Sequence, residues 1–248
     1  MAFTIPTDTR TVGTFIKTDS IQTVEVLGLC GLDYAVLDAE HAPFGRSEAN
    51  IMLLAARAVG LPMLVRVPDT ADATVLGFLD MGAAGLLVPH VDTADQARDI
   101  VGACRFIGGR RGLSLSPRFA GYGTISRVDA IASADQTPIF CQIESGRAVD
   151  NVNEIAAVSG VAGLVVGRLD LSLSMGVDSP NDPGIEKALR KVVAAGTVNN
   201  KVVIAAVGNA GEMEAVGGQG VMSFVVGSDQ SLLRMAATQL TTGAKGKR

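Results

Sequence analysis

The chain has 248 residues, of which 48% are hydrophobic, 19% charged and 4% aromatic, with a formal net charge of −4. A negative chain with no tryptophan lacks the basic and stacking surfaces that nucleic-acid-binding proteins use. Every apolar run is too short to cross a membrane, and the N-terminus lacks a secretory signal. We therefore expect a cytoplasmic protein with no nucleic-acid or membrane partner.

Short apolar runs with β-branched residues recur along the chain, with helical segments between them. They predict strands at residues 12–17, 34–38, 63–67, 85–89, 139–144, 163–167, 202–207 and 224–227. Helices are predicted at 20–29, 47–59, 93–104, 183–195 and 232–240. This alternation predicts one α/β domain over residues 1–248, a single (β/α)₈ TIM barrel, with 241–248 as a disordered tail.

Two connections are longer than the others. Residues 108–135 are rich in glycine and arginine, and residues 176–182 follow the sixth predicted strand. Long irregular connections in compact domains often carry function, so we expect both to be loops at the active site, the first together with a short helix.

Two acids stand where apolar runs stop. Glu144 closes the segment that begins at Ile139, and Asp170 closes the segment that begins at Gly163. Ligands of parallel α/β sheets bind beyond the carboxyl ends of the strands, and paired carboxylates favour a divalent cation. The structural alternative is that both acids cap the helices that follow them.

The chain contains two histidines, and His41 lies three residues beyond Asp38 at the end of the second predicted strand. An Asp–His pair could transfer protons, with Asp38 orienting the imidazole. The alternative is a capped turn with a structural histidine. A structural role is the favoured interpretation of His90, which follows the fourth predicted strand.

Arg66 interrupts an apolar run at the end of the third predicted strand. A buried arginine needs a partner or access to the barrel mouth, where it could stabilise an oxyanion. The structural alternative is a salt bridge to Asp38 or Glu40, and the two roles are compatible. Asp80 comes near the end of the third helix, which is expected between the predicted strands 63–67 and 85–89, and the helix dipole disfavours an acid there. A bridge to a neighbouring subunit would explain it.

Read together, these segments resemble the HpcH/HpaI family of metal-dependent pyruvate aldolases, the class II hydroxyketoacid aldolases. The matching strings, in order, are Leu37-Asp-Ala-Glu-His-Ala-Pro43, Leu64-Val-Arg-Val-Pro68, Leu79-Asp-Met-Gly-Ala83, Leu87-Val-Pro89, Arg110-Arg-Gly-Leu-Ser114, Gln142-Ile-Glu-Ser145 and Gly167-Arg-Leu-Asp-Leu-Ser172. Members of this family cleave substrates such as 4-hydroxy-2-oxoheptanedioate or 2-keto-3-deoxyglucarate.

The resemblance implies a role for each matching residue. Glu144 and Asp170 would bind Mg²⁺ or Mn²⁺, with Co²⁺ and Zn²⁺ as alternatives. Pyruvate would be held by Gln142, Arg66 and the backbone at Gly167 and Leu169. His41 and Asp38 would form the catalytic dyad, and Asp80 would cross a subunit interface. The family fold is a barrel whose last helix is swapped between partners in a hexamer, a trimer of dimers.

The implied activity is reversible cleavage of a 4-hydroxy-2-oxo acid to pyruvate, or hydroxypyruvate, and an aldehyde through a metal-stabilised enolate. Arg168 stands where the family usually has proline, which puts the acceptor aldehyde in doubt. Three alternatives stay open. They are an acyl-CoA lyase of the citrate or malyl-CoA type, a non-catalytic scaffold, and a Schiff-base aldolase. The last would need Lys17, because Lys201 begins its strand at the opposite end.

Overall fold

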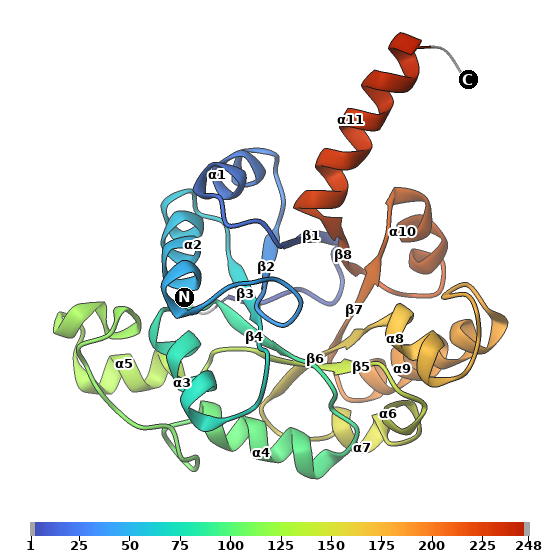
Figure 1. The fold of residues 1–248 in the computed structure, drawn as a ribbon. Helices are drawn as coiled ribbons and strands as arrows, with labels where there is room; N and C mark the ends of the chain where they lie inside the picture. Colours follow the sequence, from blue (N-terminus) through green and yellow to red (C-terminus); the bar gives the residue numbers. More distant parts are fainter. Residues whose placement is uncertain (1–2, 246–248) are drawn as a thin grey trace.

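The computed structural model of the protein describes residues 3–245. Eight parallel strands form a closed barrel in the order β1 to β8, and helices surround it (Figure 1). The strands are β1 (Thr11–Ile16), β2 (Tyr34–Asp38), β3 (Met63–Arg66), β4 (Gly85–Val88), β5 (Ile139–Ile143), β6 (Val161–Val166), β7 (Val202–Val207) and β8 (Ser223–Ser228). The predicted (β/α)₈ barrel is confirmed.

The helices alternate with the strands, as expected for this fold. They are α1 (Ile21–Leu29), α2 (Arg46–Ala58), α3 (Asp72–Asp80), α4 (Ala94–Cys104), α5 (Arg127–Ala134), α6 (Gly146–Asp150), α7 (Val152–Ala156), α8 (Arg168–Ser174), α9 (Pro183–Val198), α10 (Ala210–Gly217) and α11 (Asp229–Lys245), with the 3₁₀ segment η1 (Arg118–Gly123). Helix α4 begins with a capping box formed by Thr93 and Gln96. Helix α11 includes residues 241–245, which were expected to belong to the tail, and residues 246–248 lie outside the described residues.

Alternate residues of each strand face the barrel interior, because side chains of a strand point to opposite faces in turn. One buried cluster fills the interior and includes Tyr34 and Val36 of β2, Leu64 of β3 and Phe140 of β5. The residues between them, such as Leu37, belong to the larger cluster between the strands and the helices. This alternation decides which residues at the strand ends can face the mouth of the barrel.

The connection from α4 to β5 lies at the N-terminal end of the barrel, not at the mouth. The guanidinium of Arg118 donates to the carbonyl of Met81, at 2.7 Å, and to Asn50 Oδ1, at 2.8 Å. Met81 is the C-cap of α3, which leads into the start of β4. The expectation that 108–135 forms an active-site loop was therefore wrong, because a segment that runs from a helix to the next strand returns to the opposite end.

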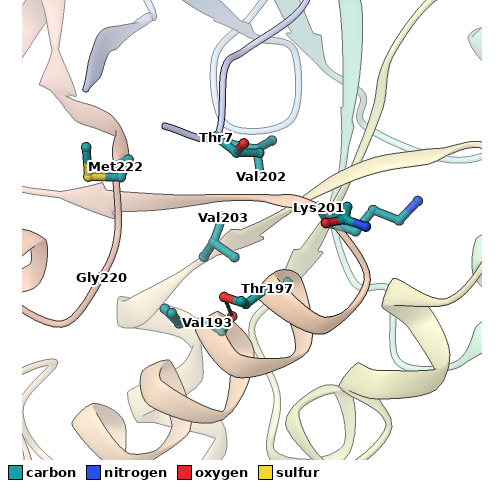
Figure 2. Close-up of a pocket in the computed structure, with 10 residues that line it drawn as sticks. Thr7, Val193, Thr197, Lys201, Val202, Val203, Gly220 and Met222 are labelled. Carbon is teal, nitrogen blue, oxygen red and sulfur yellow. Dashed lines mark hydrogen bonds between the residues drawn. The ribbon is translucent and has the colours of Figure 1, made fainter. Parts of the chain in front are cut away.

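A second feature of the N-terminal end is a cavity of about 240 Å³ between α9 and the start of β7, lined by Thr197, Lys201 and Met222 among others (Figure 2). Lys201 Nζ donates to the carbonyl of Val161 at the start of β6, at 2.7 Å. The amine therefore lies far from the carboxyl ends of the strands. Lys201 has the wrong position for a Schiff-base lysine of a barrel aldolase.

Helix α11 projects away from the barrel (Figure 1). Leu233 and Leu240 on it are 73% and 76% exposed. Among residues 3–245, no helix combines the length and the apolar character that crossing a membrane requires.

Candidate active site

Four predicted site residues continue the inward-facing series of their strands. Asp38 follows Tyr34 and Val36 on β2, Arg66 follows Leu64 on β3, and Gln142 and Glu144 follow Phe140 at the end of β5. All four are buried, with residue exposures between 0% and 6%. Polar side chains in such a position are costly unless they are paired, and their partners define the site.

Asp38 and Arg66 form a bidentate ion pair on neighbouring strands. Arg66 Nε lies 2.9 Å from Asp38 Oδ1, and Arg66 Nη2 lies 2.7 Å from Oδ2. Lys17, just beyond β1, places its Nζ 2.8 Å from the same Oδ2. Burial alone would raise the pKa of the Asp38 carboxyl, but the hydrogen bonds from Arg66 and Lys17 outweigh it and lower that pKa to about 2.

His41 does not contact Asp38 through its ring. The backbone N–H of His41 donates to Asp38 Oδ1, at 3.1 Å, so this part of the expected dyad is a capped turn. The imidazole Nε2 lies 3.7 Å from Glu40 Oε2 instead. The physical reason is that the oxygens of Asp38 are already occupied by Arg66, Lys17 and this backbone group. Glu40 is the carboxylate beside the ring, and sequence spacing alone did not separate it from Asp38.

Glu144 is held by donors on both sides. The backbone N–H of His90 donates to Glu144 Oε1 at 2.7 Å, and His90 Nδ1 lies 2.8 Å from the same oxygen. Gln142 Nε2 donates to Oε2, and Gln142 Oε1 is buried without a partner among the described residues. Burial raises the pKa of Glu144, the contacts with His90 and Gln142 lower it, and nearby Asp170 raises it further; the net direction is upward.

Gly167 follows β6 and is the N-cap of α8, whose first turn carries Leu169 and Asp170. A Cβ at position 167 would lie 2.9 Å from Gln142 Nε2 and 3.1 Å from Glu144 Oε2, so glycine leaves space beside both groups. The N–H of Gly167 is already used, because it donates to the carbonyl of Ile143 at 3.2 Å. Leu169 lies in the first turn, where an N–H has no partner within the helix.

Arg168 joins three segments at the rim of the barrel. Its guanidinium, only 6% exposed, donates to Glu212 Oε2 of α10 at 3.2 Å, to the carbonyl of Pro180 at 2.7 Å and to Asn181 Oδ1 at 2.5 Å. The position that the family resemblance assigns to proline is thus a cross-link between α8, α10 and the loop at residues 176–182. No local sequence pattern indicates these partners of Arg168.

These groups surround a cavity of about 420 Å³ at the carboxyl ends of the strands. The residues that line it include Lys17, His41, Arg66, Gln142, Gly167, Arg168, Leu169, Asp170, Glu212 and Arg234. The cavity therefore brings together most of the predicted site residues from β1, β2, β3, β5 and β6, as a TIM-barrel active site does. Of the basic residues in its wall, Arg66 and Lys17 are paired with Asp38, and Arg168 with Glu212.

Asp80 lies elsewhere. It is the last residue of α3, and Arg111 Nη2 donates to its Oδ1 at 2.9 Å. The Arg111 guanidinium lies over the adjacent rings of Phe106 and Phe119, 4.5 and 4.6 Å from their centroids. Within one chain, then, Asp80 belongs to the N-terminal end of the barrel and does not reach the cavity.

Comparison with known proteins identifies the family of this chain. The family model described as HpcH/HpaI aldolase/citrate lyase matches residues 11–236. The chain belongs to this family. Like its HpcH/HpaI relatives, it is a carbon–carbon lyase of the aldolase type.

Relatives support this assignment at the level of sequence and of structure. The 5-keto-4-deoxy-D-glucarate aldolase of Klebsiella pneumoniae is 35% identical over 228 residues, which cover 89% of this chain and 87% of that protein. The crystal structure of an HpcH/HpaI family protein from Burkholderia cenocepacia matches with a TM-score of 0.91 at 31% identity, covering 96% of each chain. An HpcH/HpaI aldolase from Desulfitobacterium hafniense matches with a TM-score of 0.90 at 26% identity, covering 97% of this chain and 94% of that one.

Proposed function

We propose that the protein is a divalent-metal-dependent aldolase that reversibly cleaves a 4-hydroxy-2-oxo acid to pyruvate, or hydroxypyruvate, and an aldehyde. The observation that carries the proposal is one cavity lined by Arg66, Gln142, Gly167 and Asp170, with Glu144 Oε2 3.1 Å from where a Cβ of Gly167 would lie. Family membership supplies the reaction class, and the curated relatives named 5-keto-4-deoxy-D-glucarate aldolase support a hydroxy-oxo acid as the substrate.

The residues fit a divalent cation. Glu144 and Asp170 offer hard carboxylate oxygens, Gln142 Oε1 is a buried acceptor without a partner among the described residues, and Gly167 leaves space beside Glu144. Among residues 3–245, no three histidine, cysteine or acidic side chains form a metal cluster, so water and substrate would complete the coordination. Mg²⁺ and Mn²⁺ bind in this way, through one or two carboxylates. When bound, such a cation supplies Lewis-acid stabilisation of negative charge on the substrate.

Arg66 is placed to stabilise the developing enolate. Two of its nitrogens are fixed by Asp38, which holds the guanidinium plane, and the remaining Nη1 has no partner among the described residues. A rigid cation directed at the keto oxygen needs no reorganisation when charge develops there. Gln142 lines the same cavity and would bind the carboxylate of the oxo acid.

His41 is the group proposed to move the proton. Its side chain is 56% exposed at the mouth, where a substrate C4 hydroxyl would arrive. In cleavage His41 accepts the hydroxyl proton, the carbonyl of the aldehyde forms, and the electron pair of the C3–C4 bond passes to C3. Protonation at C3 then gives the methyl group of pyruvate.

We further propose that the protein acts as a homo-oligomer, a hexamer built from dimers, in which α11 packs on a neighbouring subunit. The exposed Leu233 and Leu240 on α11 support this, as do Leu169 and Leu173 on α8, which are 71% and 81% exposed beside the cavity. Asp80 would then reach a neighbouring active site. Sedimentation velocity tests the assembly, and a monomer at micromolar concentration would contradict it.

Activity is tested by incubating the protein with racemic 4-hydroxy-2-oxo acids and following pyruvate with lactate dehydrogenase and NADH. We expect cleavage that stops in EDTA, returns with Mg²⁺ or Mn²⁺ and is lost in Asp170→Asn. Cleavage that survives EDTA and is trapped by borohydride would instead indicate a Schiff base at Lys17. Cleavage of an acyl-CoA ester alone would indicate the citrate-lyase branch of the family.

A further inference from the structure

His90 occupies a backbone conformation that few residues other than glycine adopt. It follows β4 and Pro89 and has a φ of 57°. Non-glycine residues in this region are uncommon, and they concentrate at functional sites where the surrounding contacts compensate for the strain. In His90 the conformation is accompanied by a hydrogen bond from its backbone N–H to Glu144, 54 residues away in sequence.

Two nitrogens of His90 lie close to the same oxygen of Glu144. The backbone N–H lies 2.7 Å from Oε1, and the ring Nδ1 lies 2.8 Å from it. The other oxygen, Oε2, faces Gly167, since a Cβ there would lie 3.1 Å away. The two His90 nitrogens restrain Oε1, while Gln142 Nε2 donates to Oε2 on the side of Gly167, so the carboxylate is restrained at both oxygens. The His90 side chain is 72% exposed, yet its ring lies against a specific partner, Glu144.

The second ring nitrogen reaches the other half of the site. His90 Nε2 lies 3.1 Å from Glu40 Oε1, and Glu40 Oε2 lies 3.2 Å from Arg66 Nε. The imidazole therefore spans the carboxylate proposed to bind the metal and the carboxylate beside Arg66. A ring held at both nitrogens is a more rigid support than a ring held at one.

We propose that His90 is a positioning residue that orients Glu144 for the divalent cation. The proposal rests on the proposed function, because it assigns Glu144 to the metal. Groups that orient a metal ligand through its other atom commonly change metal affinity by about 10-fold to 100-fold when they are removed. The role differs from that of His41, whose ring is directed at Glu40 and makes no contact with Glu144.

The test uses two variants that tolerate a positive φ. His90→Gly keeps the backbone N–H and removes the ring, and His90→Asn keeps a donor near the position of Nδ1. Binding of Mn²⁺ is measured by electron paramagnetic resonance of the free ion, and thermal melts followed by circular dichroism establish folding. We expect the Kd for Mn²⁺ to be about 10-fold higher in His90→Gly than in wild type. In His90→Asn we expect it to lie within about 3-fold of the wild-type value. His41→Asn, the control, should bind Mn²⁺ as wild type does.

Three results would overturn the proposal. They are wild-type or tighter Mn²⁺ binding by His90→Gly, equal losses in both His90 variants, and an equal loss in His41→Asn. Glu144→Gln separates this failure from that of the proposed function. If wild type binds Mn²⁺ and Glu144→Gln does not, the metal site stands whatever His90 does. A wild-type protein that binds no Mn²⁺ would overturn both proposals.

Discussion

The carboxylate of Asp38 accepts two parallel hydrogen bonds from the guanidinium of Arg66, across the neighbouring strands β2 and β3. Lysine cannot reproduce this planar, two-point contact. Arg66→Lys should therefore keep the positive charge but lose the fixed orientation of the cationic group. We expect pyruvate C3 proton exchange to fall about 100-fold, in the range found when a single oxyanion donor is removed. Exchange measured by NMR at the wild-type rate would exclude Arg66 from enolate stabilisation.

The low pKa of Asp38 predicts a specific acid sensitivity. Since the pKa falls from 3.8 to about 2 on folding, the ionised carboxylate stabilises the native state above pH 3.8, and this contribution is lost as the pH falls toward 2. The difference corresponds to about 2 kcal/mol. Urea unfolding of wild type and Asp38→Asn between pH 6 and pH 2.5 should show the advantage of wild type shrinking by about two thirds of that amount. A constant advantage would contradict the assignment.

Substitution of His41 should slow cleavage of the hydroxy-oxo acid but not proton exchange at C3 of pyruvate. Because the proposed role of its ring is at the C4 hydroxyl, His41→Ala should lower cleavage of the hydroxy-oxo acid by about 10²-fold to 10⁴-fold. Deuterium exchange at C3 of pyruvate involves no such hydroxyl and should continue at a rate near that of wild type. Loss of both activities in parallel would show that His41 acts on the enolate instead.

Arg168 offers a test of the cross-link at the rim. Proline is tolerated at the first position of a helix, so Arg168→Pro removes the side chain while α8 can still form. Without the contacts to Pro180, Asn181 and Glu212, amide hydrogen exchange across residues 176–182 should accelerate. We expect a stability loss of about 1–3 kcal/mol, and Arg168→Met should behave in the same way. Unchanged exchange in both variants would show that the cross-link does not order the loop.

Local sequence patterns were enough to predict the barrel. The strands at 34–38 and 202–207 were predicted with the bounds that the structure shows, because buried parallel strands are continuous apolar runs. The pattern also placed Arg66 and Glu144 correctly at strand ends, since both keep the inward-facing alternation of their strands. Short helices such as α6 and α7, each of five residues, gave too few turns to produce a recognisable period.

Side-chain partners were harder to predict than positions. Asp38 and Glu40 differ by two residues in sequence, and only the structure shows that Asp38 binds Arg66 and Lys17 while Glu40 lies beside His41. His90 was interpreted as structural because no local pattern indicates its contact with Glu144, 54 residues away. Contacts between distant strand ends depend on closure of the barrel, which a local pattern does not describe.

We propose that Glu144 and a divalent cation together allow the protein to form the enolate of pyruvate. Exchange of the C3 protons of pyruvate in D₂O, followed by NMR with Mg²⁺ or Mn²⁺, with EDTA, and in Glu144→Gln, tests this proposal most directly. We predict exchange with the metals that is lost in EDTA and in the variant. Exchange that persists under both conditions, or is absent in wild type with every metal and with hydroxypyruvate, would contradict the proposal.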